Sequence, residues 1–255
     1  MKSTKRSPIT DKPLHNPGQS LEEQRHDLLY DKLLTPFLMA WFLIVMAAAE
    51  WWYYLHPTER HPYLYTFIAL GFLGYAGFQF WRTLPTLRQL KLGIEGEKSV
   101  GQSLEKLREN GYQIFHDLVG DGFNLDHVII GPAGAFTIET KTISKPMRGE
   151  VKVYFDGETI RINGLVMDRD PVRQAKSQAS WLRKILNEST GQDFTVHPVV
   201  LFPGWFVEQK AETRREIWVL EPKALPTFLA NAPKVLTEER IKMVSGHLAR
   251  FIRSQ

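Results

Sequence analysis

Asn124-Leu-Asp-His-Val-Ile-Ile130 and Ala135-Phe-Thr-Ile-Glu-Thr-Lys-Thr142 are two apolar segments, joined by the turn sequence Gly131-Pro-Ala-Gly134. β-Branched and aromatic residues dominate both segments, and glycine and proline fall between them. The stretch therefore predicts two consecutive strands with a tight connection. Because side chains alternate along a strand, Glu139 and Lys141 are expected on one face and Thr140 on the other.

Three charged residues, Asp126, Glu139 and Lys141, lie in this otherwise apolar sequence. Burying a carboxylate is costly unless it is paired or binds a metal. Two carboxylates and an ammonium on adjacent strands are typical of a divalent-metal site that acts on phosphate. Taken singly, Asp126 also fits a strand-end residue that satisfies a backbone group, and Glu139 with Lys141 also fits a solvated strand end.

Composition narrows the kind of site. The chain has 255 residues, which suggests one or two domains, and no cysteine, which excludes disulfides and thiolate metal sites. A metal must then be held by oxygen or imidazole, which favours Mg²⁺ or Mn²⁺ over structural zinc. The net charge of +4 permits a nucleic-acid partner without requiring one.

Two further apolar segments precede this region. Leu33–Leu55 is about 23 residues long, or roughly 35 Å as a helix, enough to cross a ~30 Å hydrocarbon core. Tyr63–Trp81 contains no charged residue, and its glycines predict a smooth face for helix packing: Gly71, Gly74 and Gly77. We expect a disordered tail over residues 1–30 and a two-helix transmembrane hairpin in the lipid bilayer over residues 31–82.

Basic residues predict the orientation of this hairpin. The connector carries only Arg60, whereas both flanks are basic: Lys2, Lys5, Arg6, Lys12, Arg25, Lys32, Arg82, Arg88 and Lys91. The positive-inside rule then places both termini in the cytoplasm, as in a multi-pass protein of the inner, cytoplasmic membrane. A cleaved signal peptide is disfavoured, although Ala47-Ala-Ala49 resembles a cleavage site, because the polar and apolar stretches before it are too long.

The remaining sequence alternates helices and strands. Asp156-Gly157 marks a hairpin, and Asp170 with Pro171 begins a helix that Gly191 ends. The other expected elements are helices at Ile94–Asn110, Pro222–Ala230 and Thr237–Arg253, and strands at Tyr112–Leu118, Glu150–Phe155, Thr159–Ile162, Thr195–Phe202 and Ile217–Leu220. This order predicts an α/β fold with a mixed sheet flanked by helices.

Four separated blocks of this region resemble the NERD, or nuclease-related, domain. They are Gly93-Ile-Glu-Gly-Glu97, Asn124–Gly134, Glu139-Thr-Lys141 and Asp170-Pro-Val-Arg-Gln174, within Gly93–Gly204. The resemblance implies a nuclease-like domain at residues 93–220 before C-terminal helices at 221–255. It also implies the restriction-endonuclease-like α-β-β-β-α-β mixed-sheet core of the PD-(D/E)xK group. That group often has Pro-Asp where this chain has Leu125-Asp126.

The resemblance also implies a role for each site residue. Asp126 and Glu139 would bind a divalent metal directly, and Glu97 would complete the metal shell through a water molecule. Lys141 would position or polarise the attacking water and stabilise charge on the phosphate. Gln174 would orient Lys141 or a phosphate oxygen.

Other residues near these blocks leave alternatives open. Gln178 lies four residues after Gln174, so either could face inward, and we favour Gln174. His127 is expected to be structural or at the surface, and His116 with Asp117 could support the site. Two further pairs are weaker candidates: Arg173 and Lys176 for backbone phosphates, and Trp205 and Phe206 for base stacking, although a core position is favoured for the last pair.

The combined pattern predicts a membrane-anchored, cytoplasm-facing nuclease that hydrolyses phosphodiesters with Mg²⁺ or Mn²⁺. DNA is expected over RNA by analogy with the fold group. The alternative is a non-catalytic, membrane-tethered module that binds nucleic acid or protein. A transport role for the hairpin has little support, because Glu50 is the only acidic residue within the spans. The pattern distinguishes neither endonuclease from exonuclease action nor one oligomeric state from another.

Overall fold

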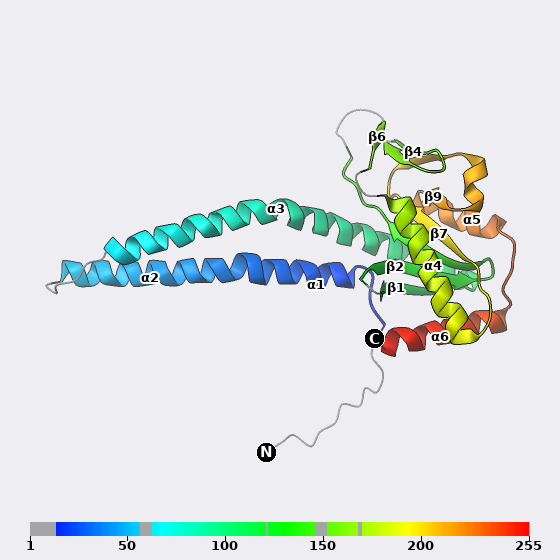
Figure 1. Ribbon diagram of the computed structural model, residues 1–255, viewed down its shortest axis with the longest axis horizontal. Helices are drawn as coiled ribbons and strands as arrows, with labels where there is room; N and C mark the ends of the chain where they lie inside the picture. The colour runs from blue at the N-terminus through cyan, green and yellow to red at the C-terminus, as the bar shows by residue number, and fades with distance from the viewer. Residues whose placement is uncertain (1–13, 57–62, 121, 146–151, 168–169, 255) are drawn as a thin grey trace, which may run out of the picture. The chain divides into compact units, whose positions relative to one another are not determined.

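The computed structural model describes residues 14–56, 63–120, 122–145, 152–167 and 170–254 (Figure 1). The chain divides into two compact units. One unit comprises Ser20–Leu92. The other combines the residues up to Gln19 with Gly93–Gln255, and it contains every strand of the described chain.

The first unit is helical. It contains α1 (Gln19–Asp27) from its second residue onward, a π-helical turn at Leu28–Leu34, α2 (Thr35–Leu55) and the first part of α3 (Tyr63–Glu105). The tail expected at residues 1–30 is therefore wrong from Gln19 onward, and residues 1–13 lie outside the described residues. The helix extends toward the N-terminus because Leu, Glu, Gln and Arg at positions 21–25 are all good helix formers.

The two long helices pack against each other through small side chains. The Phe37 and Phe80 rings lie 6.3 Å apart, and Trp51 Nε1 donates a 2.8 Å hydrogen bond to Thr66 Oγ1, so the helices run antiparallel. The buried small residues are Ala40, Ala47, Ala69 and Ala76. They recur every seven residues, a spacing that returns to nearly the same side of a helix.

The predicted glycine contact face is wrong. A Cβ atom added at Gly71, Gly74 or Gly77 would meet nothing within 4 Å. The buried small residues of α3 are instead Ala69 and Ala76, and at about 100° per residue the three glycines lie on another side of the helix. Within the described residues, Gln19–Leu55 is the one segment that is long and apolar enough to cross a membrane, judged by length and composition.

The second unit is built on a five-stranded mixed sheet. Its order is β1 (Gln113–Val119), β2 (Asn124–Gly131), β3 (Gly134–Thr140), β7 (Val196–Leu201) and β9 (Trp218–Leu220). The first three strands are antiparallel neighbours, and β7 and β9 pair in parallel. Gly134 has φ +122°, a conformation that a tight β2–β3 turn obtains most easily from glycine.

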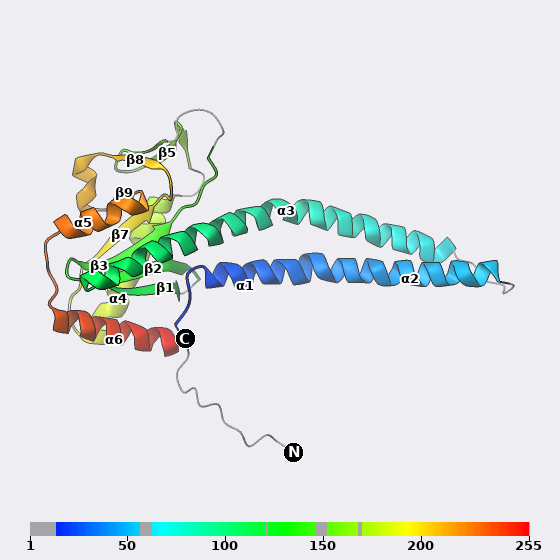
Figure 2. The same cartoon turned by 180° about the vertical axis from the view of Figure 1, so that it is seen from behind.

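Helices cover both faces of this sheet. On one face lie α4 (Pro171–Thr190) and α6 (Glu238–Ser254), as Figure 1 shows. On the other lie the last turns of α3 and α5 (Leu225–Asn231), seen in Figure 2. The order of elements confirms the α/β class and agrees with the nuclease-like α-β-β-β-α-β core.

Local signals at the helix ends appear in the structure as expected. The Asp170 carboxylate accepts hydrogen bonds of 3.0 Å from the backbone N–H groups of Val172 and Arg173, which caps α4. Gly191 ends α4 at φ +67°. A 3₁₀ turn, Lys106–Asn110, follows α3 and ends at Gly111 with φ +82°.

The expected hairpin belongs to a second, smaller sheet. Its order is β6 (Leu165–Val166), β5 (Ile160–Ile162), β4 (Lys152–Phe155) and β8 (Phe206–Gln209). Short 3₁₀ turns lie at Ala211–Arg215 and Pro222–Ala224. Trp205 is buried, as predicted, but Phe206 is 68% exposed, so its predicted core position is wrong. Phe206 begins strand β8, where its ring faces solvent instead of the core.

Candidate active site

At the carboxyl end of β3, a carboxylate, an ammonium group and two side-chain amides lie close together. Lys141 follows β3 directly, and its backbone N–H donates to the Leu201 carbonyl at 2.8 Å. Its Nζ donates to Glu139 Oε1 at 2.5 Å and to Gln174 Oε1 at 3.0 Å. The Glu139 and Lys141 side chains therefore share a face, and α4 supplies the glutamine that holds the ammonium in place.

Both glutamines of α4 contact the site. Gln178 is buried, and its Nε2 donates to Glu139 Oε2 at 2.6 Å and to the Asn124 carbonyl at 3.1 Å. Gln174 holds Lys141, whereas Gln178 holds Glu139. The preference for Gln174 alone was therefore too narrow, because residues four apart on a helix lie on one face and reach neighbouring groups.

Asp126 lies on β2 beside these groups. Its Oδ2 accepts a 2.6 Å hydrogen bond from the Thr140 backbone N–H, which is also the contact expected of a simple strand-end aspartate. Burial raises the pKa of Asp126 well above its ordinary value, and repulsion from Glu139 and Glu97 adds to the increase. The three carboxylates are thus close enough to oppose one another's ionisation.

Glu97 comes from α3, which precedes all the strands of the sheet in the chain. It is buried, and burial followed by repulsion from Asp117 and Glu139 raises its pKa from 4.5 to about 8. The neighbouring Gly96 permits this approach. A Cβ atom there would lie 1.7 Å from Thr142 Oγ1, so the helix can meet the chain after Lys141 only where it has no side chain.

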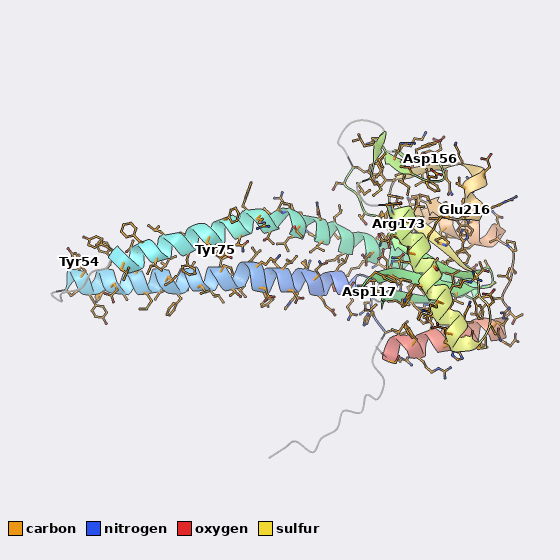
Figure 3. All side chains as sticks on the ribbon, viewed as in Figure 1. Tyr54, Tyr75, Asp117, Asp156, Arg173 and Glu216 are labelled. Carbon is orange, nitrogen blue, oxygen red and sulfur yellow. The ribbon has the colours of Figure 1, made fainter. Side chains whose placement is uncertain are left out.

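Asp117 is a member of the site that the sequence indicated only weakly. It is buried, has φ +49°, and is the largest source of repulsion acting on Glu97 (Asp117 is labelled in Figure 3). A left-handed conformation at a residue other than glycine is uncommon and is concentrated at functional positions. No spacing pattern in the sequence predicts that Asp117 lies in the site. The only sequence signal was its place at the end of a strand.

The segment just before α1 also packs onto this region. His15 Nδ1 lies 2.8 Å from the Asp117 carbonyl oxygen, and a Cβ atom at Gly101 would lie 2.5 Å from Pro17 Cγ. Gly18 lies next to Glu97, whose Oε2 would be 3.6 Å from an added Cβ. The residues from His15 to Gly18 therefore belong to the second unit, with Gly93–Gln255.

His127 contacts a second histidine instead of the carboxylates. Its Nδ1 lies 2.9 Å from His116 Nδ1, and His116 Nε2 lies 2.9 Å from Glu105 Oε1. Burial lowers the pKa of His127 well below its ordinary value, and proximity to His116 adds to the decrease. These contacts give His127 a structural role on β2.

The donor set fits a hard divalent cation in part. Asp126, Glu139 and Glu97 offer carboxylate oxygens, which Mg²⁺ and Mn²⁺ prefer, and a dication would relieve their repulsion. Among the residues that the structure describes, however, no group of three or more His, Cys, Asp or Glu side chains is placed to hold a metal ion. Lys141 instead occupies one oxygen of Glu139. These carboxylates alone would not complete the coordination of Mg²⁺, so water molecules would have to supply the remaining ligands.

Among the comparisons with known proteins, the match to a family model bears on the nuclease-like assignment. No curated protein matches the chain. Among solved structures, SfsA of Pyrococcus furiosus in complex with Ca²⁺ aligns at 14% identity with a TM-score of 0.25. The alignment covers 49% of this chain and 55% of the SfsA chain, so it spans about half of each. The family model described as "Nuclease-related domain" matches residues 92–203, so this part of the chain is similar to that domain.

Proposed function

We propose that this chain is a membrane-anchored nuclease that hydrolyses nucleic-acid phosphodiesters with a divalent metal. One observation carries the proposal. The Lys141 ammonium lies 2.5 Å from Glu139 at the end of β3, within electrostatic reach of Asp126 and Glu97, whose pKa values are raised. Carboxylates crowded in this way around a lysine are poised to bind a cation and a phosphate.

Each residue has a role that its contacts support. Asp126 and Glu139 would hold Mg²⁺ or Mn²⁺, with Glu97 joining through water. The bound metal would lower the pKa of a coordinated water and neutralise charge on the phosphate. Lys141, held by Glu139 and Gln174, would orient the attacking water and stabilise the charge that develops on the phosphate oxygens. At pH 7 without metal, Glu97 keeps its proton because its pKa is about 8.

The substrate would approach along the exposed side of α4. Arg173, Lys176, Ser177 and Ser180 line an open hollow of about 480 Å³ near the start of this helix. Lys176 Nζ makes an exposed 2.8 Å ion pair with Glu216. Figure 3 labels Glu216, and it also labels Arg173 on α4. Exposed pairs of this kind contribute little and exchange readily for phosphate. We favour DNA over RNA by analogy with the fold group.

The helical unit supports a membrane anchor. Large apolar side chains on α2 and α3 face outward, including Trp41, Phe67 and Trp81, each more than 60% exposed. Such a surface suits lipid better than water. We propose that α2 and the first part of α3 form a hairpin in the inner membrane, with both termini in the cytoplasm.

Labelling of single cysteines at Ser3 and Thr58 with a membrane-impermeant maleimide in intact cells tests this topology. Only Thr58, in the connector, should react.

The nuclease activity is tested with the full chain in detergent, because a fragment beginning near Arg88 would lack the packed residues 14–18. Circular and linear single- and double-stranded DNA, and RNA, are incubated with Mg²⁺, Mn²⁺ or EDTA. We expect metal-dependent cleavage that Asp126→Asn abolishes, with Arg250→Ala in α6 as the matched control. Cleavage of circular substrates identifies an endonuclease. If the intact chain cuts none of these substrates with either metal, it is not a nuclease.

A non-catalytic module that binds nucleic acid or protein is the second candidate. It is favoured by the absence, within the described ranges, of three ligands already placed for a metal. Calorimetry with Mn²⁺ separates the two candidates. The nuclease should bind Mn²⁺ and lose that binding in Asp126→Ala. DNA binding without Mn²⁺ binding would favour the module.

A further inference from the structure

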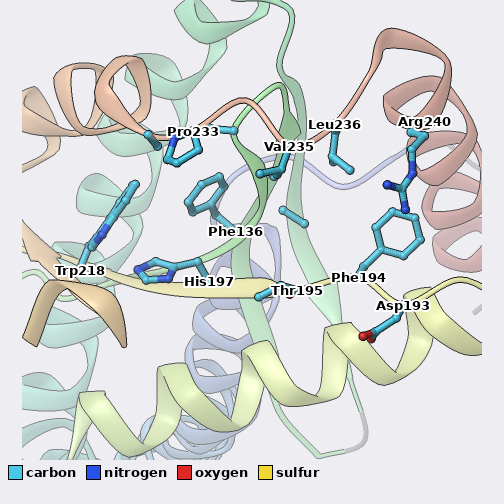
Figure 4. A pocket seen from close by; sticks show the side chains of 14 residues that line it. Phe136, Asp193, Phe194, Thr195, His197, Trp218, Pro233, Val235, Leu236 and Arg240 are labelled. Carbon is cyan, nitrogen blue, oxygen red and sulfur yellow. The ribbon is translucent and has the colours of Figure 1, made fainter.

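A second cavity lies at the opposite end of β3. It has a volume of about 460 Å³ and opens where β3 and β7 begin, between the sheet and the loop that leads to α6 (Figure 4). Phe136 is three residues from Glu139 and five from Lys141 on one extended segment, which places it roughly 10 Å and 16 Å from them along the strand. None of the residues that line the cavity is among those assigned to the hydrolytic site.

One wall of the cavity is aromatic. The Trp218 ring lies 5.2 Å from Phe136 at an interplanar angle of 33° and 4.8 Å from His197 at 56°. The Phe136 and His197 rings are 5.9 Å apart. Flat, apolar walls of this kind favour a planar ring as ligand, because π-faces stack on one another with little regard to the ring's identity.

His197 gives this wall a polar atom without a partner. Its Nε2 is buried and has no hydrogen-bond partner in the structure. Burial lowers its pKa to about 4, so the ring is neutral at pH 7 and offers one N–H and one lone pair. Leaving a buried polar atom unsatisfied is costly, and a ligand with a complementary donor or acceptor would remove that cost.

The opposite wall is held in place by the backbone. The N–H groups of Val235 and Leu236 both donate to the Pro132 carbonyl, at 2.8 and 3.1 Å. A Cβ atom at Gly134 would lie 3.5 Å from Val235 Cγ2, so the loop contacts the β2–β3 turn closely. The cavity is therefore formed before any ligand arrives, which lowers the entropic cost of binding.

The far end of the cavity carries a positive charge. The Arg240 guanidinium lies over the Phe194 ring at 5.0 Å, and its Nη2 donates to Gln192 Oε1 at 3.1 Å. The nearby Asp193 is paired with Arg183 Nη2 at 2.8 Å. Within the described residues Arg240 makes no ion pair with a carboxylate, so its remaining N–H groups suit an anion.

We propose that this cavity binds a nucleotide, with the base against the wall of Phe136, His197 and Trp218 and the phosphate at Arg240. A volume of about 460 Å³ accommodates one nucleotide. The shared chemistry, a base joined to a phosphate, can come from a free mononucleotide or from the end of a strand. The proposal is independent of hydrolysis at the carboxylate end, because no residue is common to the two sites.

Calorimetry on the full chain in detergent tests the proposal, in EDTA and in the Asp126→Asn background so that no ligand is hydrolysed. The probes are AMP, adenosine and a 5′-phosphorylated oligodeoxyadenylate. We expect Arg240→Ala to weaken AMP binding about 10-fold and to leave adenosine unchanged, because it removes one charged contact. His197→Phe keeps the ring but loses the nitrogen, and should weaken AMP and adenosine alike, by about 5-fold.

Arg250→Ala, on the same helix as Arg240 but outside the cavity, is the matched control and should bind like the parent protein. Tighter binding of the oligonucleotide than of AMP, with the same dependence on Arg240, identifies a strand end as the ligand. Equal or tighter binding of AMP identifies a free nucleotide. The proposal is overturned if no probe binds up to about 5 mM, the weak limit of specific binding, or if Arg240→Ala and His197→Phe both bind like the parent. Arg240 is partly exposed, so its variant keeps the test valid even if His197→Phe fails to fold.

Discussion

The two ends of β3 differ in the kind of polar group that they bury. At the carboxyl end, Glu139 and its neighbours crowd like charges around one lysine. At the amino end, Phe136 lies beside a neutral histidine in an aromatic cavity. The same strand, seven residues long, thus supports an ionic site and an apolar one.

The two ends of β3 can be told apart by the direction in which the pKa values of their buried groups are shifted. Crowded carboxylates retain protons, so their pKa values rise, whereas a histidine removed from water without a counter-charge loses its proton and its pKa falls. The two ends should therefore respond to pH in opposite directions.

Glu97 should make the metal-free protein less stable as pH rises. Its pKa is raised from 4.5 to about 8, so between these values the folded state binds a proton that the unfolded state does not. The free energy of unfolding then falls with rising pH across that window, by at most about 5 kcal/mol. Urea unfolding in EDTA from pH 5 to pH 8.5 measures the slope. Glu97→Gln should flatten it, whereas Glu95→Gln, exposed on the same helix, should not. Equal slopes in parent and Glu97→Gln would contradict the burial of this carboxyl.

Replacing Lys141 should affect catalysis more than folding. Lys141→Met removes the ammonium that Glu139 and Gln174 hold, and with it the charge that would act on the phosphate in the proposed hydrolysis. We expect kcat to fall about 10³-fold, equivalent to about 4 kcal/mol, with a smaller change in KM. Single-turnover cleavage with saturating Mn²⁺ measures the effect. Lys141→Arg keeps the charge and should retain part of the rate. A change in KM alone would assign Lys141 to substrate binding.

His197 should have the opposite pH signature. Its folded-state pKa is about 4, below the ordinary 6.5, so in this window the unfolded state binds the extra proton. Stability is then greatest above pH 6.5 and is lost as pH falls toward 4, by about 3 kcal/mol. Thermal melts from pH 4 to pH 7 should show this loss in the parent and in Thr195→Val, a nearby cavity residue without a titratable group. They should not show it in His197→Phe. A parent melt that does not vary with pH would mean that His197 is accessible to water.

Local signals in the sequence predicted most of the sheet and the position of Glu139 beside Lys141. Asp170, Gly111 and Gly191 mark helix ends through short-range geometry, and the period of two placed Glu139 beside Lys141. These features depend on residues that are close together in the chain, and the sequence can therefore predict them.

What the sequence did not predict depends on contacts between distant segments. The helix α3 continues through Pro85 to Glu105, although proline usually ends a helix. Asp117 reaches Glu97 only because β1 lies beside the end of α3, and its positive φ has no sequence marker. The aromatic cavity needs β3, β7 and β9 side by side, so Phe136, His197 and Trp218 show no shared pattern along the chain.

Gly96 offers the smallest and most local test of the carboxylate end. Gly96→Ala would place a Cβ atom 1.7 Å from Thr142 Oγ1, on a short, branched side chain that cannot swing away. We expect a loss of about 2 kcal/mol in unfolding free energy, together with weaker Mn²⁺ binding, because α3 must move Glu97 away from Asp126. Gly246→Ala in α6 is the matched control. It meets nothing within 4 Å and should stabilise the protein by about 0.5–1 kcal/mol through helix propensity. Because both changes add one methyl group to a helical glycine, the difference between them isolates the contact with Thr142. If Gly96→Ala behaves like Gly246→Ala in stability and in Mn²⁺ binding, the close approach of α3 does not position Glu97.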